Sequence, residues 1–167
     1  MIGQNSIEME KAVKSSSDFL LLQLEGLKEH LDILIRDRAI GKSQVQNLLR
    51  AAQTASGIPE LKLFVQYQMG RDEKRTGWAK EYKHKKFGER MISVLSSIEE
   101  RAKTLAHEEV GIDSQTAVGL KLAERFFVYL QWHFTYVEST QKKQQRPEND
   151  AGKRPPYSKS QNRGERR

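Results

Sequence analysis

Residues 114–138 read SQTAVGLKLAERFFVYLQWHFTYVE and carry two apolar stripes at helical spacing. The first stripe contains Leu120, Ala123, Phe127, Leu130, Phe134 and Val137, and the second contains Leu122, Phe126, Tyr129, His133 and Tyr136. A helix that is apolar on more than one side must be covered on more than one side. We therefore expect this segment to be either the central helix of a bundle or a helix whose second face is shared with a partner subunit.

Upstream, four more stretches repeat apolar residues every three or four positions. Their inner positions are Leu20, Leu24, Leu27, Leu31 and Leu34 in the first; Val45, Leu48, Leu49 and Ala52 in the second; Leu61, Phe64, Val65 and Met69 in the third; and Phe87, Met91, Val94, Leu95, Ile98, Ala102 and Leu105 in the fourth.

Helix boundaries can be placed from capping and breaking residues. Ser and Asp in SSSD, residues 15–18, would cap the first helix, which should end near Arg38, and Pro59 suits the first turn of the third. Gly111, followed by Asp113 and Ser114, should separate the last two helices, and the last should end near Glu138. No run of strand length alternates β-branched and polar residues, so the sequence gives no indication of a β-strand. We predict an all-α fold: a compact bundle of about five to six helices over residues 15–139, preceded by a flexible extension over 1–14.

The chain has 167 residues and a formal net charge of +7, and its charge is unevenly distributed. Residues 140–167 hold nine Lys or Arg against three acids and contain no Val, Leu, Ile or Phe. Without burial such a segment cannot offset the entropy lost on ordering, so we expect a disordered basic tail. Its charge would attract any polyanion, either as an RNA-binding element or as unspecific solubilising charge.

A second basic block, residues 71–90, has eight Lys or Arg against four acids, which leaves the rest of the fold at about −3. A one-sided basic surface is typical of a phosphate binder. Trp78 and Tyr82 lie among these cations and could stack on unpaired bases, or they could pack on each other along one helix face. Phe87 begins an apolar repeat and is predicted to be a core residue.

Several function classes find no support in the sequence. There is no cysteine, the four histidines have no helical partner for a metal pair, and no phosphate-cradling glycine loop follows a strand. The longest apolar run, FLLLQL at 19–24, is too short to span a membrane. We expect a soluble cytoplasmic protein that is not an enzyme and has no cofactor, metal or membrane contact. The carboxylates Glu29, Asp37 and Glu99 fall on polar faces, which weakens the case for a catalytic pocket.

Four segments resemble, in order and spacing, the small subunit of type III CRISPR effector complexes (Csm-type). They are SQVQNLL (43–49), LKLFVQYQMGRD (61–72), FGERMISVLSSI (87–98) and AERFFVYLQWHFTYVE (123–138). The resemblance covers roughly residues 15–139 and excludes the tail and the N-terminal extension. Gln46 and Gln68 stand where the family usually carries an arginine and an acid, respectively, so Lys42 or Arg50 would have to supply one expected phosphate contact.

The resemblance implies a non-catalytic subunit, stacked in several copies, that lines the groove holding guide RNA and target RNA while other subunits of the complex carry out cleavage. Such a groove needs cations on phosphates, because the guide itself reads the sequence. The predicted RNA-binding residues are Lys42, Arg50, Lys62, Arg71, Lys74, Arg75, Lys80, Lys83, Lys86 and Arg125.

Gly70 and Arg71 end the third predicted helix. On one interpretation Gly70 takes a left-handed conformation or makes room for RNA, and Arg71 projects toward a phosphate. On the other, Arg71 only neutralises Asp72 or the helix dipole. A protein-only adaptor, whose last helix binds a partner and whose basic block is a solvated face, remains the alternative function.

Overall fold

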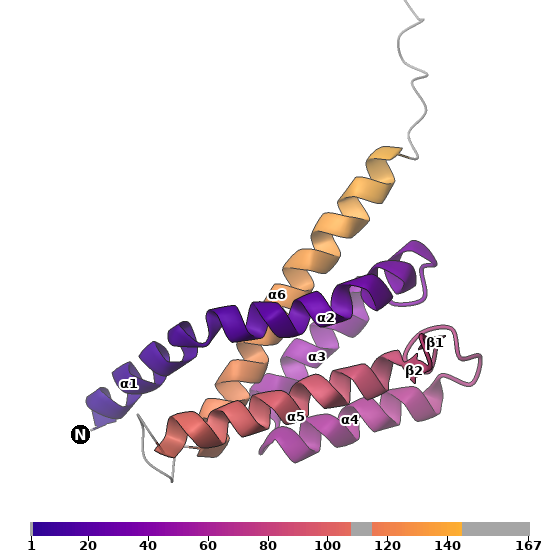
Figure 1. Ribbon diagram of the computed structural model, residues 1–167. Coiled ribbons are helices and arrows are strands. Elements are labelled where there is room, and N and C mark those ends of the chain that lie inside the picture. The colour runs from indigo at the N-terminus through magenta and orange to yellow at the C-terminus, as the bar shows by residue number, and fades with distance from the viewer. Residues whose placement is uncertain (1, 108–114, 145–167) are drawn as a thin grey trace, which may run out of the picture.

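The computed structural model describes residues 2–107 and 115–144, which form a helical bundle (Figure 1). Its helices are α1 (Ile2–Ser15), α2 (Ser17–Arg36), α3 (Lys42–Thr54), α4 (Ile58–Arg71), α5 (Phe87–Leu105) and α6 (Gln115–Gln144). The strands β1 (Glu81–Tyr82) and β2 (Lys85–Lys86) form a short antiparallel hairpin between α4 and α5. The prediction of an all-α bundle of five to six helices is confirmed.

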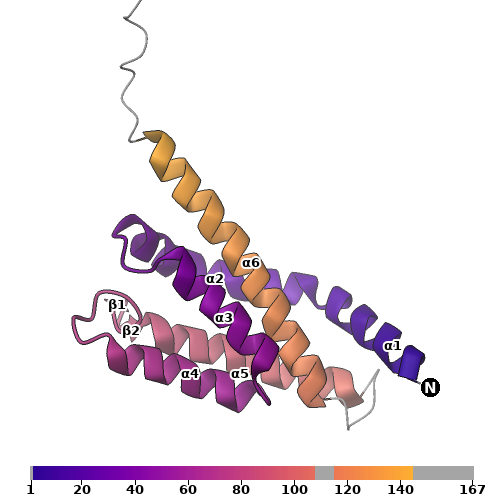
Figure 2. The same ribbon diagram turned by 180° about the vertical axis from the view of Figure 1, so that it is seen from behind.

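The two apolar stripes of α6 are explained by its central position in the bundle. α6 packs against α1, α2, α3, α4 and α5, and both Phe126 and Phe127 are fully buried. Within the described part of the chain, α6 is therefore the central helix of the bundle, which was the first of the two predictions for residues 114–138. Its C-terminal end extends past the other helices (Figure 1, Figure 2). In the C-terminal half of α6, Trp132 and Tyr136 are 63% and 69% exposed.

The core follows the predicted inner faces of the other helices. Buried residues include Leu20, Leu24, Leu27, Leu31 and Leu34 of α2; Val45, Leu48 and Ala52 of α3; Leu61 and Val65 of α4; and Phe87, Met91, Val94, Leu95, Ile98, Ala102 and Leu105 of α5. Leu49, Phe64 and Met69 lie at the margin of this core and are partly buried. Pro59 occupies the first turn of α4, as predicted.

The N-terminal region differs from the expectation. Residues 2–15 form α1 instead of a flexible extension, because Ala12 is fully buried while Met9 and Val13 pack against the core from the same face. Ser16 occupies the N-cap position of α2, as predicted, but its side chain makes no capping hydrogen bond. The hydroxyls of Ser15 and Ser16 instead donate back to the Ala12 carbonyl of α1, at 2.9 Å and 3.0 Å.

The C-terminal boundary of the bundle also moves. α6 continues past Glu138 to Gln144, so the first residues of the predicted tail are helical. The rest of that tail, 145–167, and the predicted boundary at Gly111, Asp113 and Ser114 lie outside the described residues.

Candidate nucleic-acid interface

Most of the predicted RNA-binding residues meet at one end of the bundle. The α2–α3 connection, the C-terminal end of α4, the hairpin and the start of α5 all lie at this end in both views (Figure 1, Figure 2). We call it the basic end and define it by Lys42, Arg71, Lys74, Arg75, Lys80, Lys83 and Lys86. Residues far apart in the sequence are thus brought onto one surface.

Long-range contacts hold the basic end together. Lys80 forms an ion pair with Asp37 at the end of α2, and a Cβ at Gly77 would lie 2.9 Å from the Ala39 carbonyl oxygen. The backbone N–H of Gly88 donates to the Trp78 carbonyl at 2.9 Å. The segment between α4 and α5 is therefore fixed against both the α2–α3 connection and α5.

Asp72 organises the loop that follows α4. Its carboxylate accepts the backbone N–H groups of Thr76, Gly77 and Ala79 at 3.2, 2.8 and 2.9 Å. Partial burial acts to raise the pKa of Asp72, but the three N–H donors outweigh it and leave that pKa below its usual value. The loop is thus built around an ionised carboxylate that already has its partners.

Arg71 consequently remains available. It makes no ion pair with Asp72 in the part of the chain that the structure describes, and its guanidinium lies over the exposed Tyr67 ring, 5.4 Å from the centroid. Gly70 stays in α4, whose C-cap is Asp72. The predicted left-handed closure at Gly70 is therefore wrong, although a Cβ there would meet no atom within 4 Å. That open space beside Arg71 is compatible with a ligand.

Some cations of the basic end already have carboxylate partners and others do not. Lys80 and Lys83 are paired with Asp37 and Glu29, and the hydrogen bond from Lys83 is the main cause that lowers the pKa of the Glu29 carboxyl. By contrast, the side chains of Lys42, Lys74 and Arg75 are exposed and have no ion pair within residues 2–107 and 115–144. The unpaired group can bind an external anion without first breaking an internal contact.

Lys83 and His84 form the turn of the hairpin with positive φ angles of 50° and 61°. A two-residue turn of this kind normally uses Asn or Gly, because side chains of other residues disfavour φ above zero. The structure nevertheless presents a cation at its tip. The position of His84 in this turn was not predicted, since the turn lacks the glycine that would have indicated a hairpin.

The aromatic residues of the block do not form a stacking platform as a set. Trp78 is only 3% exposed and packs against the Phe87 ring at 5.5 Å, so it cannot receive a base on its face. Tyr82 lies in β1 and packs against His30, not against Trp78. Base stacking by Trp78 and the packing of Trp78 on Tyr82 were wrong predictions, while the core position predicted for Phe87 is confirmed.

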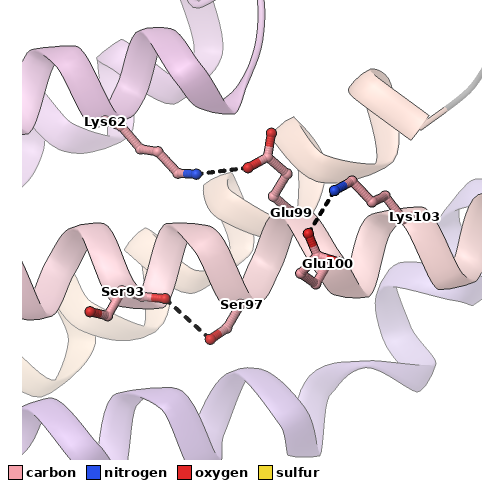
Figure 3. A network of polar contacts seen from close by, with 6 residues as sticks. All are labelled: Lys62, Ser93, Ser97, Glu99, Glu100 and Lys103. Carbon is pink, nitrogen blue, oxygen red and sulfur yellow. Dashed lines mark hydrogen bonds and ion pairs between the residues drawn. The ribbon is translucent and has the colours of Figure 1, made fainter.

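Three predicted residues lie away from the basic end. Arg50 is exposed along α3, and Arg125 on α6 donates to the Tyr129 hydroxyl at 3.2 Å beside α1. Lys62 bridges α4 to α5 through a 2.7 Å ion pair with Glu99 (Figure 3). The spacing of apolar residues predicts which face of α4 carries Lys62, but it does not predict that a carboxylate of another helix pairs with this lysine.

A surface pocket of about 390 Å³ lies beside Arg71. α3 contributes Gln44 and Asn47 to its lining, and α4 contributes Gln68 and Arg71. Ala39 and the loop residues Asp72, Thr76, Gly77 and Trp78 complete the wall. These amides were not predicted as site residues, although they belong to two of the segments that carry the family resemblance.

The described residues show no arrangement typical of metal or membrane chemistry. Within 2–107 and 115–144, no three His, Asp or Glu side chains gather where a metal ion could bind. No helix in that same part of the chain is long and apolar enough to cross a membrane. Glu29, Asp37 and Glu99 are each paired with a lysine and do not converge on a pocket.

Comparisons with protein-family models, curated proteins and solved structures find no match for this chain.

Proposed function

We propose that this protein is a non-catalytic, RNA-binding small subunit of a type III CRISPR interference complex. It lines the path of the guide RNA and target RNA through sequence-independent phosphate contacts and stacks with its own copies. The observation that carries the proposal is the convergence of exposed cations without internal ion pairs at the basic end. The resemblance of four segments to the family is the reason for proposing a type III CRISPR complex as the assembly.

The charge distribution supports a phosphate-binding role. The rest of the fold, apart from block 71–90 and the tail, has a net charge of about −3, so the cations concentrate on one side of the domain. An RNA backbone following this surface would release counterions at each phosphate that it neutralises. Arg71 adds a planar fork already oriented by Tyr67, which suits bidentate phosphate binding.

The test is fluorescence anisotropy with unrelated single-stranded RNAs over a series of salt concentrations. The proteins are the full chain, residues 1–144, and the triple variant Arg71→Ala/Lys74→Ala/Arg75→Ala. A control triple variant, Lys11→Ala/Lys14→Ala/Lys103→Ala, removes the same charge from the surface of α1 and from the last turn of α5, away from the basic end.

We expect residues 1–144 to retain salt-dependent binding without sequence preference. The basic-end variant should lose about 0.7 in the slope of log K against log salt for each phosphate contact removed, and the control should change little. Equal slopes in both variants would argue against the basic end as the RNA path. Loss of all binding with the tail would do the same.

One observation favours a second function, that of a protein-binding adaptor. Trp132 and Tyr136 lie one helical turn apart in the C-terminal half of α6 and are largely exposed. If the protein binds a partner protein through this face, binding should be lost in Trp132→Ala and should be insensitive to RNA and salt.

A further inference from the structure

The pocket beside Arg71 has a chemistry different from that of the rest of the basic end. Three neutral amides, Gln44, Asn47 and Gln68, contribute to its polar lining, with Arg71 as its cation and Asp72 as its carboxylate. Arg71 lies next to Tyr67 at the end of α4, and the amides of Asn47 and Gln68 come from the facing helices α3 and α4. The carboxamides add hydrogen-bond donors and acceptors beside Arg71 but no further positive charge for a phosphate.

Its amides are available for a ligand. The side-chain amides of Asn47 and Gln68 make no hydrogen bond within the described ranges 2–107 and 115–144. Gln44 uses its carbonyl oxygen to accept the Gly41 N–H at 3.0 Å, which leaves its NH₂ group to donate. Each free carboxamide offers a donor pair and an acceptor side by side, the pattern that matches the hydrogen-bonding edge of a nucleobase.

The wall of the pocket is fixed before any ligand arrives. Trp78 is buried, and the carboxylate of Asp72 already accepts three backbone N–H groups. Gly77 lies so close to the Ala39 carbonyl that the loop backbone is held against the α2–α3 connection. Because the wall does not need to be ordered on binding, even a small ligand can be held there.

We propose that this pocket receives one unpaired nucleobase of the bound RNA, whose edge hydrogen-bonds to Asn47 and Gln68 while its phosphate pairs with Arg71. The inference rests on the proposed function and deepens it. Besides the phosphate contacts, the protein would then bind one base that has left the RNA stack. Proteins that recognise single-stranded RNA commonly bind such unstacked bases. A volume of about 390 Å³ lies in the range of small-molecule sites.

The experiment follows the side-chain amide signals of the isotopically labelled full chain by NMR. The probes are AMP, GMP, CMP, UMP and ribose 5-phosphate, each added up to about 10 mM, which detects even weak binding. We expect at least one nucleotide to shift the amide signals of Asn47 and Gln68, and ribose 5-phosphate to leave them in place. Equal shifts with ribose 5-phosphate, or no shift with any nucleotide, would overturn the base pocket.

Variants separate a specific pocket from a general surface effect. Asn47→Leu should weaken the nucleotide response of Gln68 about five- to tenfold, the effect of losing one or two hydrogen bonds. The control Gln53→Leu changes another amide on α3 whose partner is Glu124, 3.2 Å away, and should respond like the unsubstituted protein. An unchanged response in Asn47→Leu would contradict the assignment.

Anisotropy with single-stranded RNA and with the same RNA carrying abasic nucleotides distinguishes this inference from the proposed function. If both RNAs bind equally and Asn47→Leu has no effect, the base pocket is wrong while the phosphate path stands. If the full chain binds neither RNA but nucleotides still shift Asn47 and Gln68, the pocket stands as a mononucleotide site and the proposed function fails.

Discussion

His30 couples the stability of the basic end to pH. Its side chain is 1% exposed and packs between the rings of Tyr82 and Phe87, with centroids 5.5 and 5.4 Å away. In the part of the chain that the structure describes, neither ring nitrogen makes a hydrogen bond of regular geometry, although the backbone of Lys80 interacts with the ring and weakly favours its protonated form. Burial, reinforced by the nearby charge of Arg90, lowers the pKa of His30 from 6.5 to about 4.

The sign of the effect follows from where the proton binds. Between pH 6.5 and about 4, the unfolded chain protonates at His30 and the folded chain does not, so acid favours unfolding. With these two pKa values, the free energy of unfolding should fall by about 2 kcal/mol between about pH 7.5 and pH 5. The carboxyl groups with lowered pKa, such as Asp37 and Asp72, lose their contribution at lower pH and interfere little at pH 5.

The assay is urea unfolding of the unsubstituted protein and of His30→Met at both pH values. Methionine is apolar and flexible enough to fill the site, and it removes two unsatisfied nitrogens. We expect the free energy of unfolding of His30→Met to change about 2 kcal/mol less than that of the unsubstituted protein. Equal losses in both proteins would refute the reasoning and would mean that His30 finds a partner or becomes solvated.

Three further substitutions test individual contacts. Gly70→Ala should raise the free energy of unfolding by up to about 1 kcal/mol, because a Cβ in this helix meets no atom within 4 Å; weaker RNA binding by the same variant in anisotropy would indicate that RNA fills the space. Gly77→Ala should cost about 1–3 kcal/mol in urea unfolding, since its Cβ would lie 2.9 Å from the Ala39 carbonyl oxygen and backbone would have to move; an unchanged midpoint would contradict this. Lys62→Met should alter stability by less than about 1 kcal/mol and leave RNA affinity unchanged, because Lys62 is held by Glu99 in a partly exposed pair; a reduced salt slope would restore Lys62 as a phosphate contact.

Much of the fold could be predicted from the spacing of apolar residues. The double stripe of 114–138 identified a helix that had to be covered on two sides, and α6 is indeed surrounded by the other helices. The inner positions of α2, α3 and α5 were predicted almost residue by residue. The boundaries were less accurate, because Ser15 and Ser16 can either cap a new helix or bond back to the preceding one, and their sequence alone does not distinguish these roles.

The candidate site was only partly predictable. The composition of block 71–90 correctly indicated where the cations of the candidate site lie in the sequence. Composition does not show which of these cations already have a carboxylate partner. Lys80 and Lys83 have partners on α2. Packing of Trp78 on Tyr82 was one of two alternatives, whereas Trp78 is buried against Phe87 and Tyr82 packs against His30.

The sequence by itself determined the helices, their buried faces and the excess of cations between α4 and α5, because helical period and charge are properties of neighbouring residues. Only the tertiary structure decided that Lys42 joins Arg71 at one end of the bundle and that Asn47 and Gln68 line one pocket. Those relations depend on how α3 and α4 approach each other and on how Asp72 fixes the following loop. Such contacts join residues distant in the chain, and no local pattern encodes them.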